Sequence, residues 1–211
     1  MKSRTEAEEN ERLDALRKFE ADLQSRGYAL IAGIDEVGRG PLAGPVMAAA
    51  VILPAGARIP GINDSKKLSA KKREMLAKAI KEHAVAWAIG AMNEKAVDEM
   101  NILQATRKAM EEAVEGLSQK PDALLIDALS LPKIPIKQLS IVKGDSLSVS
   151  IAAASILAKV ERDALMTAYH ELYPEYGFDS NKGYGTAKHL EAIGKYGLCP
   201  IHRVTFAAKF L

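Results

Sequence analysis

Cysteine, aromatic side chains, net charge and long apolar runs are all scarce in this sequence of 211 residues. The single cysteine, Cys199, excludes a disulfide-stabilised scaffold and a zinc site built from several cysteines. The net charge is only +2 at pH 7, so any surface that attracts a polyanion must be local. The longest apolar runs, near residues 46–53 and 151–158, are far shorter than the roughly 20 residues that span a bilayer. The N-terminus also lacks the apolar stretch of a secretory signal, so we expect a cytoplasmic protein with no membrane partner.

What the sequence does contain is typical of one globular domain with an appended segment. Hydrophobic residues make up 48% and charged residues 27%, as in ordinary soluble domains. Residues 1–27 predict one charged amphipathic helix, because apolar side chains recur there at helical spacing: Leu13, Leu16, Phe19 and Leu23. We expect this extension to pack on the body, and a partner-binding arm is the alternative. Residues 28–211 are expected to form the main domain.

The remaining pattern predicts an α/β fold, with a mixed central sheet of about five strands flanked by helices. Strands are expected at residues 28–35, 46–53, 84–91, 123–127 and 139–142. Helices are expected at residues 69–82, 93–117, 146–173 and 186–195. The first two strands should form a hairpin around a glycine-rich turn at residues 38–44. Residues 128–137 and 177–185 are expected to be loops.

Carboxylates occur where three of the expected strands end. Asp35 and Glu36 end the first strand, Asp127 ends the fourth, and Asp145 follows the fifth. Each alone has a simple alternative, such as the start of a turn or the cap of a helix. Together they are more informative, because parallel strands bring such ends into one crevice.

Four clustered carboxylates repel one another unless a cation neutralises them. Two unit charges about 4 Å apart cost roughly 4 kcal/mol at an effective dielectric constant of about 20. Oxygen ligands without histidine or cysteine favour Mg²⁺ or Mn²⁺ over zinc. A pair of such ions about 3.5–4 Å apart is the arrangement that cleaves phosphodiesters. The acids therefore predict a metal-dependent phosphodiesterase.

The glycine-rich turn fits neither a dinucleotide-binding nor a P-loop motif, because its glycines have the wrong spacing and a strand follows. A turn of small residues beside the acids instead allows close approach of a ligand to the backbone, although a plain hairpin turn is the alternative. Tyr184, between two glycines, is expected to be exposed and able to stack on a sugar or base. Several loop cations can bind phosphates there, or be ordinary solvated charges: Arg39, Lys66, Lys143, Lys182 and Arg203. The four histidines lack close metal-site spacing, so most are interpreted as structural or surface residues. Cys199 has no evident base partner in the sequence and is interpreted as structural.

Several motifs, in order along the chain, resemble the ribonuclease HII family. They are IAGIDEVGRG at residues 31–40, NDSK at 63–66, LID at 125–127, VKGD at 142–145, AAAS at 152–155 with Lys159, and KGYGT at 182–186. The match runs from about residue 29 to Phe206 and therefore covers nearly the whole main domain. The resemblance implies a ribonuclease H-like fold.

The resemblance also implies roles for particular residues. The four metal-binding catalytic acids of the family correspond to Asp35, Glu36, Asp127 and Asp145. The turn Gly38, Arg39 and Gly40 corresponds to the family element whose backbone senses the ribose 2′-hydroxyl, which distinguishes RNA from DNA. Tyr184 corresponds to the tyrosine that stacks on the sugar of the following deoxynucleotide. The residues carried over as phosphate binders are Lys66, Lys143, Ser155 and Lys182.

We therefore expect a two-metal endoribonuclease, using Mn²⁺ or Mg²⁺, that acts on RNA–DNA hybrids and on ribonucleotides embedded in duplex DNA. Cleavage on the 5′ side of the ribonucleotide would leave a 3′-hydroxyl and a 5′-phosphate, as in ribonucleotide repair and primer removal. The related ribonuclease HIII family typically has Glu as its fourth acid and a large N-terminal domain. This sequence has Asp145 as its fourth acid and only a short N-terminal extension. No clamp-binding peptide is recognisable, and we expect a monomer. The alternatives are a hybrid-only ribonuclease and a non-catalytic hybrid-binding module.

Overall fold

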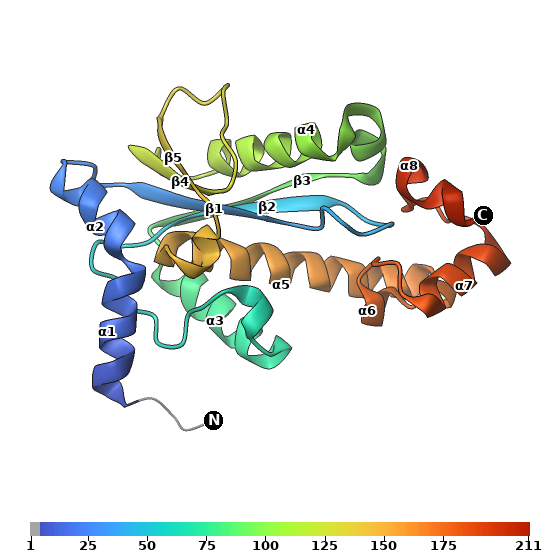
Figure 1. The fold of residues 1–211 in the computed structure, drawn as a ribbon, viewed down its shortest axis with the longest axis horizontal. Helices are drawn as coiled ribbons and strands as arrows, with labels where there is room; N and C mark the ends of the chain where they lie inside the picture. The colour runs from blue at the N-terminus through green and yellow to red at the C-terminus, as the bar shows by residue number, and fades with distance from the viewer. Residues whose placement is uncertain (1–4) are drawn as a thin grey trace.

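A mixed five-stranded sheet forms the centre of the computed structural model, which describes residues 5–211 (Figure 1). Its strands, in the order β3-β2-β1-β4-β5, are β1 (Ile31–Val37), β2 (Val46–Ile52), β3 (Ala86–Met92), β4 (Ala123–Asp127) and β5 (Lys137–Ile141). The pairs β1–β2 and β2–β3 are antiparallel, whereas β4 lies parallel to both β1 and β5. The predicted fold class, the five strands and the first hairpin are confirmed.

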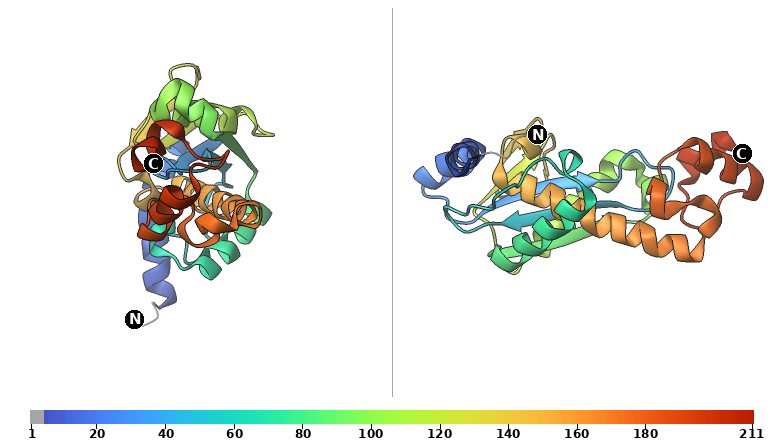
Figure 2. Two further views of the ribbon diagram at one scale, coloured as in Figure 1. Left: turned by 90° about the vertical axis from the view of Figure 1, so that its right-hand side faces the viewer. Right: turned by 90° about the horizontal axis from the view of Figure 1, so that it is seen from below.

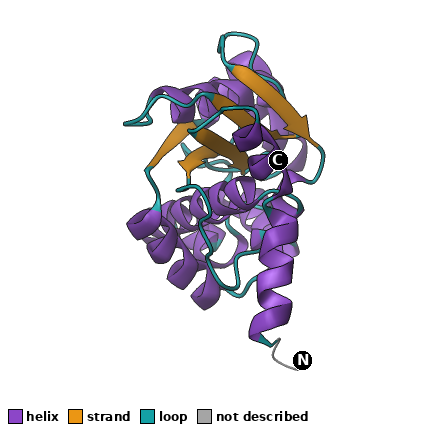
Figure 3. Ribbon diagram, turned by 90° about the vertical axis from the view of Figure 1, so that its left-hand side faces the viewer, coloured by secondary structure: helices purple, strands orange, loops and turns teal. Residues whose placement is uncertain are grey.

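Helices cover both faces of the sheet (Figure 3). One face packs against α4 (Glu94–Glu115), and the other against α3 (Ala70–His83) and α5 (Val149–Leu172). The sequence allows very close packing, because a Cβ on Gly33 would lie 2.1 Å from the main chain of Ser150 on α5. On the other face, a Cβ on Gly90 would lie 2.0 Å from Ala109 O on α4. Small residues therefore set the distance between the sheet and its helices.

The long helices differ from the predicted ones in detail. Asn101 has φ 66° and ψ 162° inside α4, and its side chain accepts hydrogen bonds from the next turn, so the helix is kinked there. The predicted start of α5 at Ser146 is wrong. Ser146 belongs to a 3₁₀ turn, η2 (Gly144–Ser146), and Ser148 caps α5 instead by accepting a hydrogen bond from Ile151 N.

The N-terminal extension consists of two helices, α1 (Glu6–Leu16) and α2 (Lys18–Ser25), so the prediction of one continuous helix is wrong. The break is at Arg17, whose φ and ψ of −98° and 7° do not continue the helix. Residues 1–4 of the predicted helix lie outside the described residues. Leu13 and Leu16 are buried in the core beneath the sheet, so the extension packs on the body within the described range.

A small helical lobe ends the chain at one end of the elongated molecule (Figure 2). It contains η3 (Pro174–Tyr176), α6 (Phe178–Asn181), α7 (Ala187–Tyr196), α8 (Val204–Ala207) and η4 (Ala208–Phe210). The expected loop at residues 177–185 therefore holds one short helix, α6, capped on both sides by residues in the left-handed conformation. Met166 of α5 belongs to the core of this lobe, so α5 connects it to the sheet. Within residues 5–211, no helix is both long and apolar enough to cross a membrane.

Candidate active site

The four predicted acids lie where the parallel strands β1, β4 and β5 end. Asp35 lies in β1 and is 4% exposed, with α5 covering its side of the sheet. Glu36 follows it, and Asp127 is the last residue of β4. Asp145 lies in η2, which follows β5, and is also buried. A hydrogen bond of 2.7 Å from Gly144 N to Asp127 Oδ1 joins the last two elements. The sheet topology thus brings together acids that are up to about 110 positions apart in the sequence, as Asp35 and Asp145 are.

The charges of these acids influence one another. Burial, followed by the charges of Glu36 and Asp127, raises the pKa of Asp35 well above its ordinary value. The pKa of Glu36 is raised mainly by burial and further by Asp127, while Arg39 opposes the shift. Burial also raises the pKa of Asp127, the Gly144 N–H opposes this, and the charge of Asp145 adds to it. Such mutual repulsion in a partly buried cluster calls for a cation.

The chemistry of the four acids fits a hard divalent cation, because they offer only carboxylate oxygens. As arranged here, however, no three His, Cys, Asp or Glu side chains within residues 5–211 form a group that would hold one metal ion. Two of the acids are turned to cations instead. Asp145 Oδ2 lies 3.6 Å from Lys66 Nζ, and Glu36 Oε1 lies 3.8 Å from Arg39 Nη1. Binding an ion would therefore require these carboxylates to approach one another.

The predicted phosphate-binding lysines differ in their surroundings. Lys66 is exposed and lies beside the acids through Asp145. Lys143 is exposed, has φ 59°, and its amino group has no partner within residues 5–211. Lys182 is half-buried, and its amino group donates to Thr167 Oγ1 at 2.7 Å and to Asp163 O at 3.3 Å. Lys66 and Lys143 are thus exposed, while Lys182 is held against α5, and phosphate binding by all three stays a prediction.

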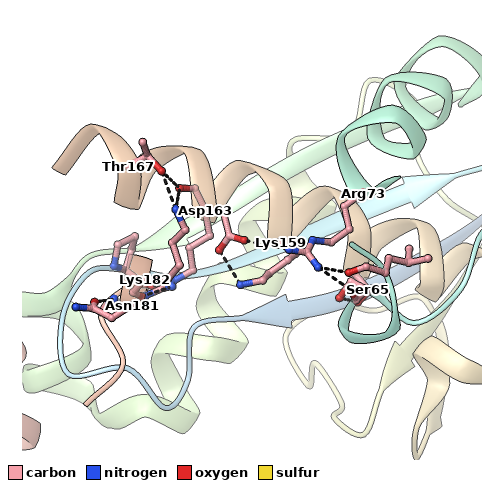
Figure 4. Close-up of polar contacts among 12 residues, drawn as sticks. Ser65, Arg73, Lys159, Asp163, Thr167, Asn181 and Lys182 are labelled. Carbon is pink, nitrogen blue, oxygen red and sulfur yellow. Dashed lines mark hydrogen bonds and ion pairs between the residues drawn. The ribbon is translucent and has the colours of Figure 1, made fainter. Parts of the chain in front are cut away.

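A row of polar side chains along α5 runs from Ser65 through Arg73 and Asp163 to Lys182 (Figure 4). Ser155 is 4% exposed, its Oγ lies 2.8 Å from that of Ser65, and its hydroxyl opposes the rise in the pKa of Asp35. Arg73 Nη1 donates a hydrogen bond to Ser65 O at 3.1 Å, and Arg73 Nη2 lies 3.7 Å from Asp163 Oδ2. Asp163 in turn accepts from Lys159 at 2.7 Å. Ser155 is therefore a buried support of Asp35 in this conformation, and phosphate binding by Ser155 stays a prediction.

The glycine-rich turn faces Tyr184. Gly38 is buried with φ +89°, a conformation that favours glycine, whereas Arg39 and Gly40 are exposed. Tyr184 is 44% exposed, and a Cβ on Gly40 would lie 3.7 Å from its Cε1. A hydrogen bond of 2.8 Å from Leu42 N to Gly183 O joins the two loops. The expectation of an exposed Tyr184 is confirmed.

The interpretation of Arg203 as a solvated or phosphate-binding loop cation is wrong, because its side chain is fully buried behind the glycine-rich turn. Arg162, which the sequence reasoning did not single out, is also fully buried. The available signal was its position at helical spacing between Ala158 and Met166 on the inward face of α5.

Burial raises the pKa of the Cys199 thiol to about 11, so the thiol is protonated at neutral pH. The structure does place a histidine beside Cys199, because its Sγ lies 3.1 Å from Nδ1 of His202, and a structural role for Cys199 stays a prediction.

Comparison with known proteins identifies relatives of the whole main domain. Residues 32–209 match the family model described as Ribonuclease HII. A protein named Ribonuclease HII from Caldanaerobacter subterraneus subsp. tengcongensis is 57% identical over 203 residues, which cover 96% of this chain and 84% of the relative. The crystal structure of ribonuclease H2 from Pyrococcus horikoshii has a TM-score of 0.73 at 27% identity, covering 86% of this chain and 96% of that one. The ribonuclease HII of Archaeoglobus fulgidus, solved in a PCNA:RNase HII complex, has a TM-score of 0.68 at 26% identity, covering 84% and 94%.

Proposed function

Because this chain belongs to the ribonuclease HII family, and is thus a divalent-metal-dependent endoribonuclease with ribonuclease H activity on RNA–DNA hybrids, we propose a finer activity for it. It nicks duplex DNA on the 5′ side of a single embedded ribonucleotide and leaves a 3′-hydroxyl and a 5′-phosphate. The observation that carries this proposal is the position of Tyr184 beside Gly40, close to a cluster of four acids. The four acids would carry out the cleavage, and the two facing loops, which carry Gly40 and Tyr184, would determine which bond is cleaved.

The acids Asp35, Glu36, Asp127 and Asp145 would hold the ions. Two bound Mg²⁺ or Mn²⁺ ions would supply a nucleophile at neutral pH and neutralise the charge on the leaving oxygen. Asp35 Oδ1 accepts a hydrogen bond from Glu36 N at 2.7 Å, and the Ser155 hydroxyl favours the charged form of Asp35. Lys66, which pairs with Asp145, provides a positive charge for a substrate phosphate. The exposed Lys143 is a second candidate for phosphate binding.

The exposed part of the glycine-rich turn would recognise the ribose. A main-chain N–H at Arg39 or Gly40 can donate to the 2′-hydroxyl oxygen, and a deoxyribose offers no such acceptor. Tyr184 would then pack its ring on the sugar of the next deoxynucleotide. The two contacts together define a junction from RNA to DNA, which explains how one ribonucleotide within DNA suffices for recognition.

The test is incubation of the protein with a labelled DNA duplex that contains one ribonucleotide, with Mg²⁺, with Mn²⁺ and with a chelator. We expect a metal-dependent nick on the 5′ side of the ribonucleotide and no cleavage of the matched all-DNA duplex. A long RNA–DNA hybrid serves as the second substrate. Cleavage of the hybrid alone would keep the four-acid site but overturn the roles of Gly40 and Tyr184. Binding without cleavage in any metal would support the non-catalytic alternative.

A further inference from the structure

A buried arginine on α5 connects the two loops that face the substrate. Arg162 is fully buried. It donates three hydrogen bonds of 2.9–3.1 Å, to the main-chain oxygens of Pro45, Lys182 and Ala43. Pro45 and Ala43 belong to the glycine-rich turn and its exit, and Lys182 precedes Tyr184 by two positions. One guanidinium group therefore bonds both loops at once.

A second buried arginine, at the start of α8, holds the glycine-rich turn itself. Arg203 is also fully buried. It donates four hydrogen bonds of 2.6–3.1 Å, to the main-chain oxygens of Gly38, Arg39, Pro41 and Gly44. Its guanidinium therefore contacts the turn on both sides of Gly40. The five fixed donors of arginine suit such a fan of oxygens, whereas the single ammonium of lysine does not.

Neither guanidinium forms a direct ion pair with a carboxylate within residues 5–211, and the charges of Asp163 on Arg162 and of Asp98 and Glu94 on Arg203 act from farther away. Within residues 5–211, both bond only to main-chain oxygens. Burial lowers the pKa of Arg162, and burial together with the positive charge of Arg162 lowers the pKa of Arg203 to about 10. An arginine guanidinium is basic enough to stay charged in a protein at neutral pH. A buried charge without a direct ion-pair partner is costly. Two such charges behind one turn indicate that the conformation of this turn matters for function.

The arginines also determine where the N–H groups of the turn point. Across a trans peptide, the C=O of one residue and the N–H of the next point in opposite directions, and no described peptide is cis. Turning the oxygens of Gly38 and Arg39 toward Arg203 therefore turns the N–H groups of Arg39 and Gly40 away from it. Neither N–H has an acceptor within residues 5–211. Both are thus available donors on the side where Gly40 meets Tyr184.

We infer that Arg162 and Arg203 are positioning residues that fix the spacing between the N–H groups of residues 39–40 and the ring of Tyr184, and thereby determine recognition of a lone ribonucleotide. This inference rests on the function proposed above. A long hybrid presents a 2′-hydroxyl at every nucleotide of its RNA strand, so many registers on the enzyme are productive. A single embedded ribonucleotide presents one. Loss of the spacing therefore weakens cleavage at the single ribonucleotide more than cleavage of the hybrid.

The first test is hydrogen exchange of the substrate-free protein, which needs no activity. The wild type is compared with Arg162→Lys, Arg203→Lys and the control Met110→Ala, which removes a fully buried side chain of α4, in the core on the opposite face of the sheet from α5. We expect the hydrogen-bonded amides of the two loops, those of Leu42, Gly44 and residues 182–184, to exchange about tenfold faster in both arginine variants. In Met110→Ala, these amides should keep their wild-type rates even where overall stability falls. Unchanged exchange in the arginine variants would overturn the inference.

The second test compares kcat/KM on the single-ribonucleotide duplex with kcat/KM on the long hybrid. The ratio should fall about tenfold in Arg203→Lys and Arg162→Lys, which corresponds to loss of one well-placed contact, and remain unchanged in Met110→Ala. If the wild type cleaves neither substrate, the proposed function fails, but the exchange experiment still decides the inference. If the wild type cleaves both and the variants keep the wild-type ratio, the inference is wrong while the proposed function stands.

A third variant covers the case in which an arginine variant does not fold. A Cβ on Gly183 would lie 2.4 Å from Ala43 O, so Gly183→Ala must push the two loops apart while both arginine side chains are retained. We expect the same faster exchange at Leu42 and Gly44 and the same fall in the kcat/KM ratio. A normal ratio in Gly183→Ala with the loops displaced would show that their spacing does not govern recognition.

Discussion

The imidazole rings of His189 and His202 face each other inside the C-terminal lobe, with their Nε2 atoms 3.0 Å apart. Cys199 N donates to Nδ1 of His202 at 3.0 Å, so the remaining proton of His202 lies on Nε2, toward His189. At the other end, Nδ1 of His189 donates to Tyr184 O at 2.9 Å. The chain of hydrogen bonds requires both rings to be neutral, and it ends on the backbone of the residue that we place against the substrate.

This pair makes the stability of the protein sensitive to acid. Burial and the neighbouring His189 lower the pKa of His202 to about 4, whereas an unfolded histidine titrates near 6.5. The stabilising contribution is therefore complete above about pH 6.5 and is lost as the pH falls to about 4, a change on the order of 3 kcal/mol. Urea unfolding at pH 7.5 and pH 4.5 should show a smaller loss in His202→Gln than in the wild type. His83→Gln, at an exposed histidine, should behave like the wild type. Equal losses in all three proteins would contradict the assignment.

Removal of the buried acid should separate stability from activity. The pKa of the Asp35 carboxyl is raised by burial and by two neighbouring acids, so its ionised form destabilises the folded state. Asp35→Asn removes this charge, and the melting temperature should rise by about 2–4 °C for each kcal/mol of stability gained. Cleavage should fall by about 1,000-fold or more, because several kcal/mol of transition-state stabilisation are lost. In thermal melts, added Mg²⁺ or Mn²⁺ should raise the melting temperature of the wild type but not that of the variant. The exposed Asp14→Asn serves as the control and should alter none of these quantities by much. Full activity in Asp35→Asn would refute the four-acid site.

The ring of Tyr184 should govern substrate choice rather than folding. Tyr184→Ala is expected to lower kcat/KM on a single embedded ribonucleotide by about tenfold or more, since aromatic stacking is worth about 1–3 kcal/mol. Tyr184→Phe should keep most of the activity because it keeps the ring. The matched control is Tyr196→Ala, at an exposed tyrosine of the same lobe. An unchanged rate in Tyr184→Ala would show that the ring does not contact the substrate.

The N-terminal extension should contribute to stability through Glu20. This side chain of α2 is buried and accepts hydrogen bonds from Ser148 Oγ at 2.6 Å and Ser150 N at 3.0 Å, at the beginning of α5. Glu20→Ala leaves these donors without an acceptor and should lower the free energy of unfolding by about 1–3 kcal/mol. Glu20→Gln retains an acceptor and should cost less, as measured by urea unfolding. If both variants matched the wild type, the extension would be dispensable for the stability of α5.

Much of the local structure is encoded in short stretches of sequence. Alternating elements, the hairpin of β1 and β2, and the caps Ser69 and Asn93 follow from neighbouring residues, so pattern alone predicts them. The acids at the strand ends are also recognisable, because a carboxylate after an apolar run is unusual. The start of α5 is harder to predict, because a residue distant in sequence holds the turn before it. Gly144 N in η2 donates a hydrogen bond to Asp127 at the end of β4, and α5 begins only after this turn.

The sequence by itself therefore determined the fold class, the four acids and the exposed Tyr184, since each depends on residue type and local periodicity. Only the tertiary structure decided what lies behind the site. The burial of Arg162 and Arg203 depends on carbonyl oxygens that come from distant parts of the chain, and no local pattern distinguishes such an arginine from a solvated one. The same is true of Glu20 at α5 and of His189 against His202. A hydrogen bond between residues far apart in sequence is specified by the packing of whole elements, so it becomes visible only when the chain has folded.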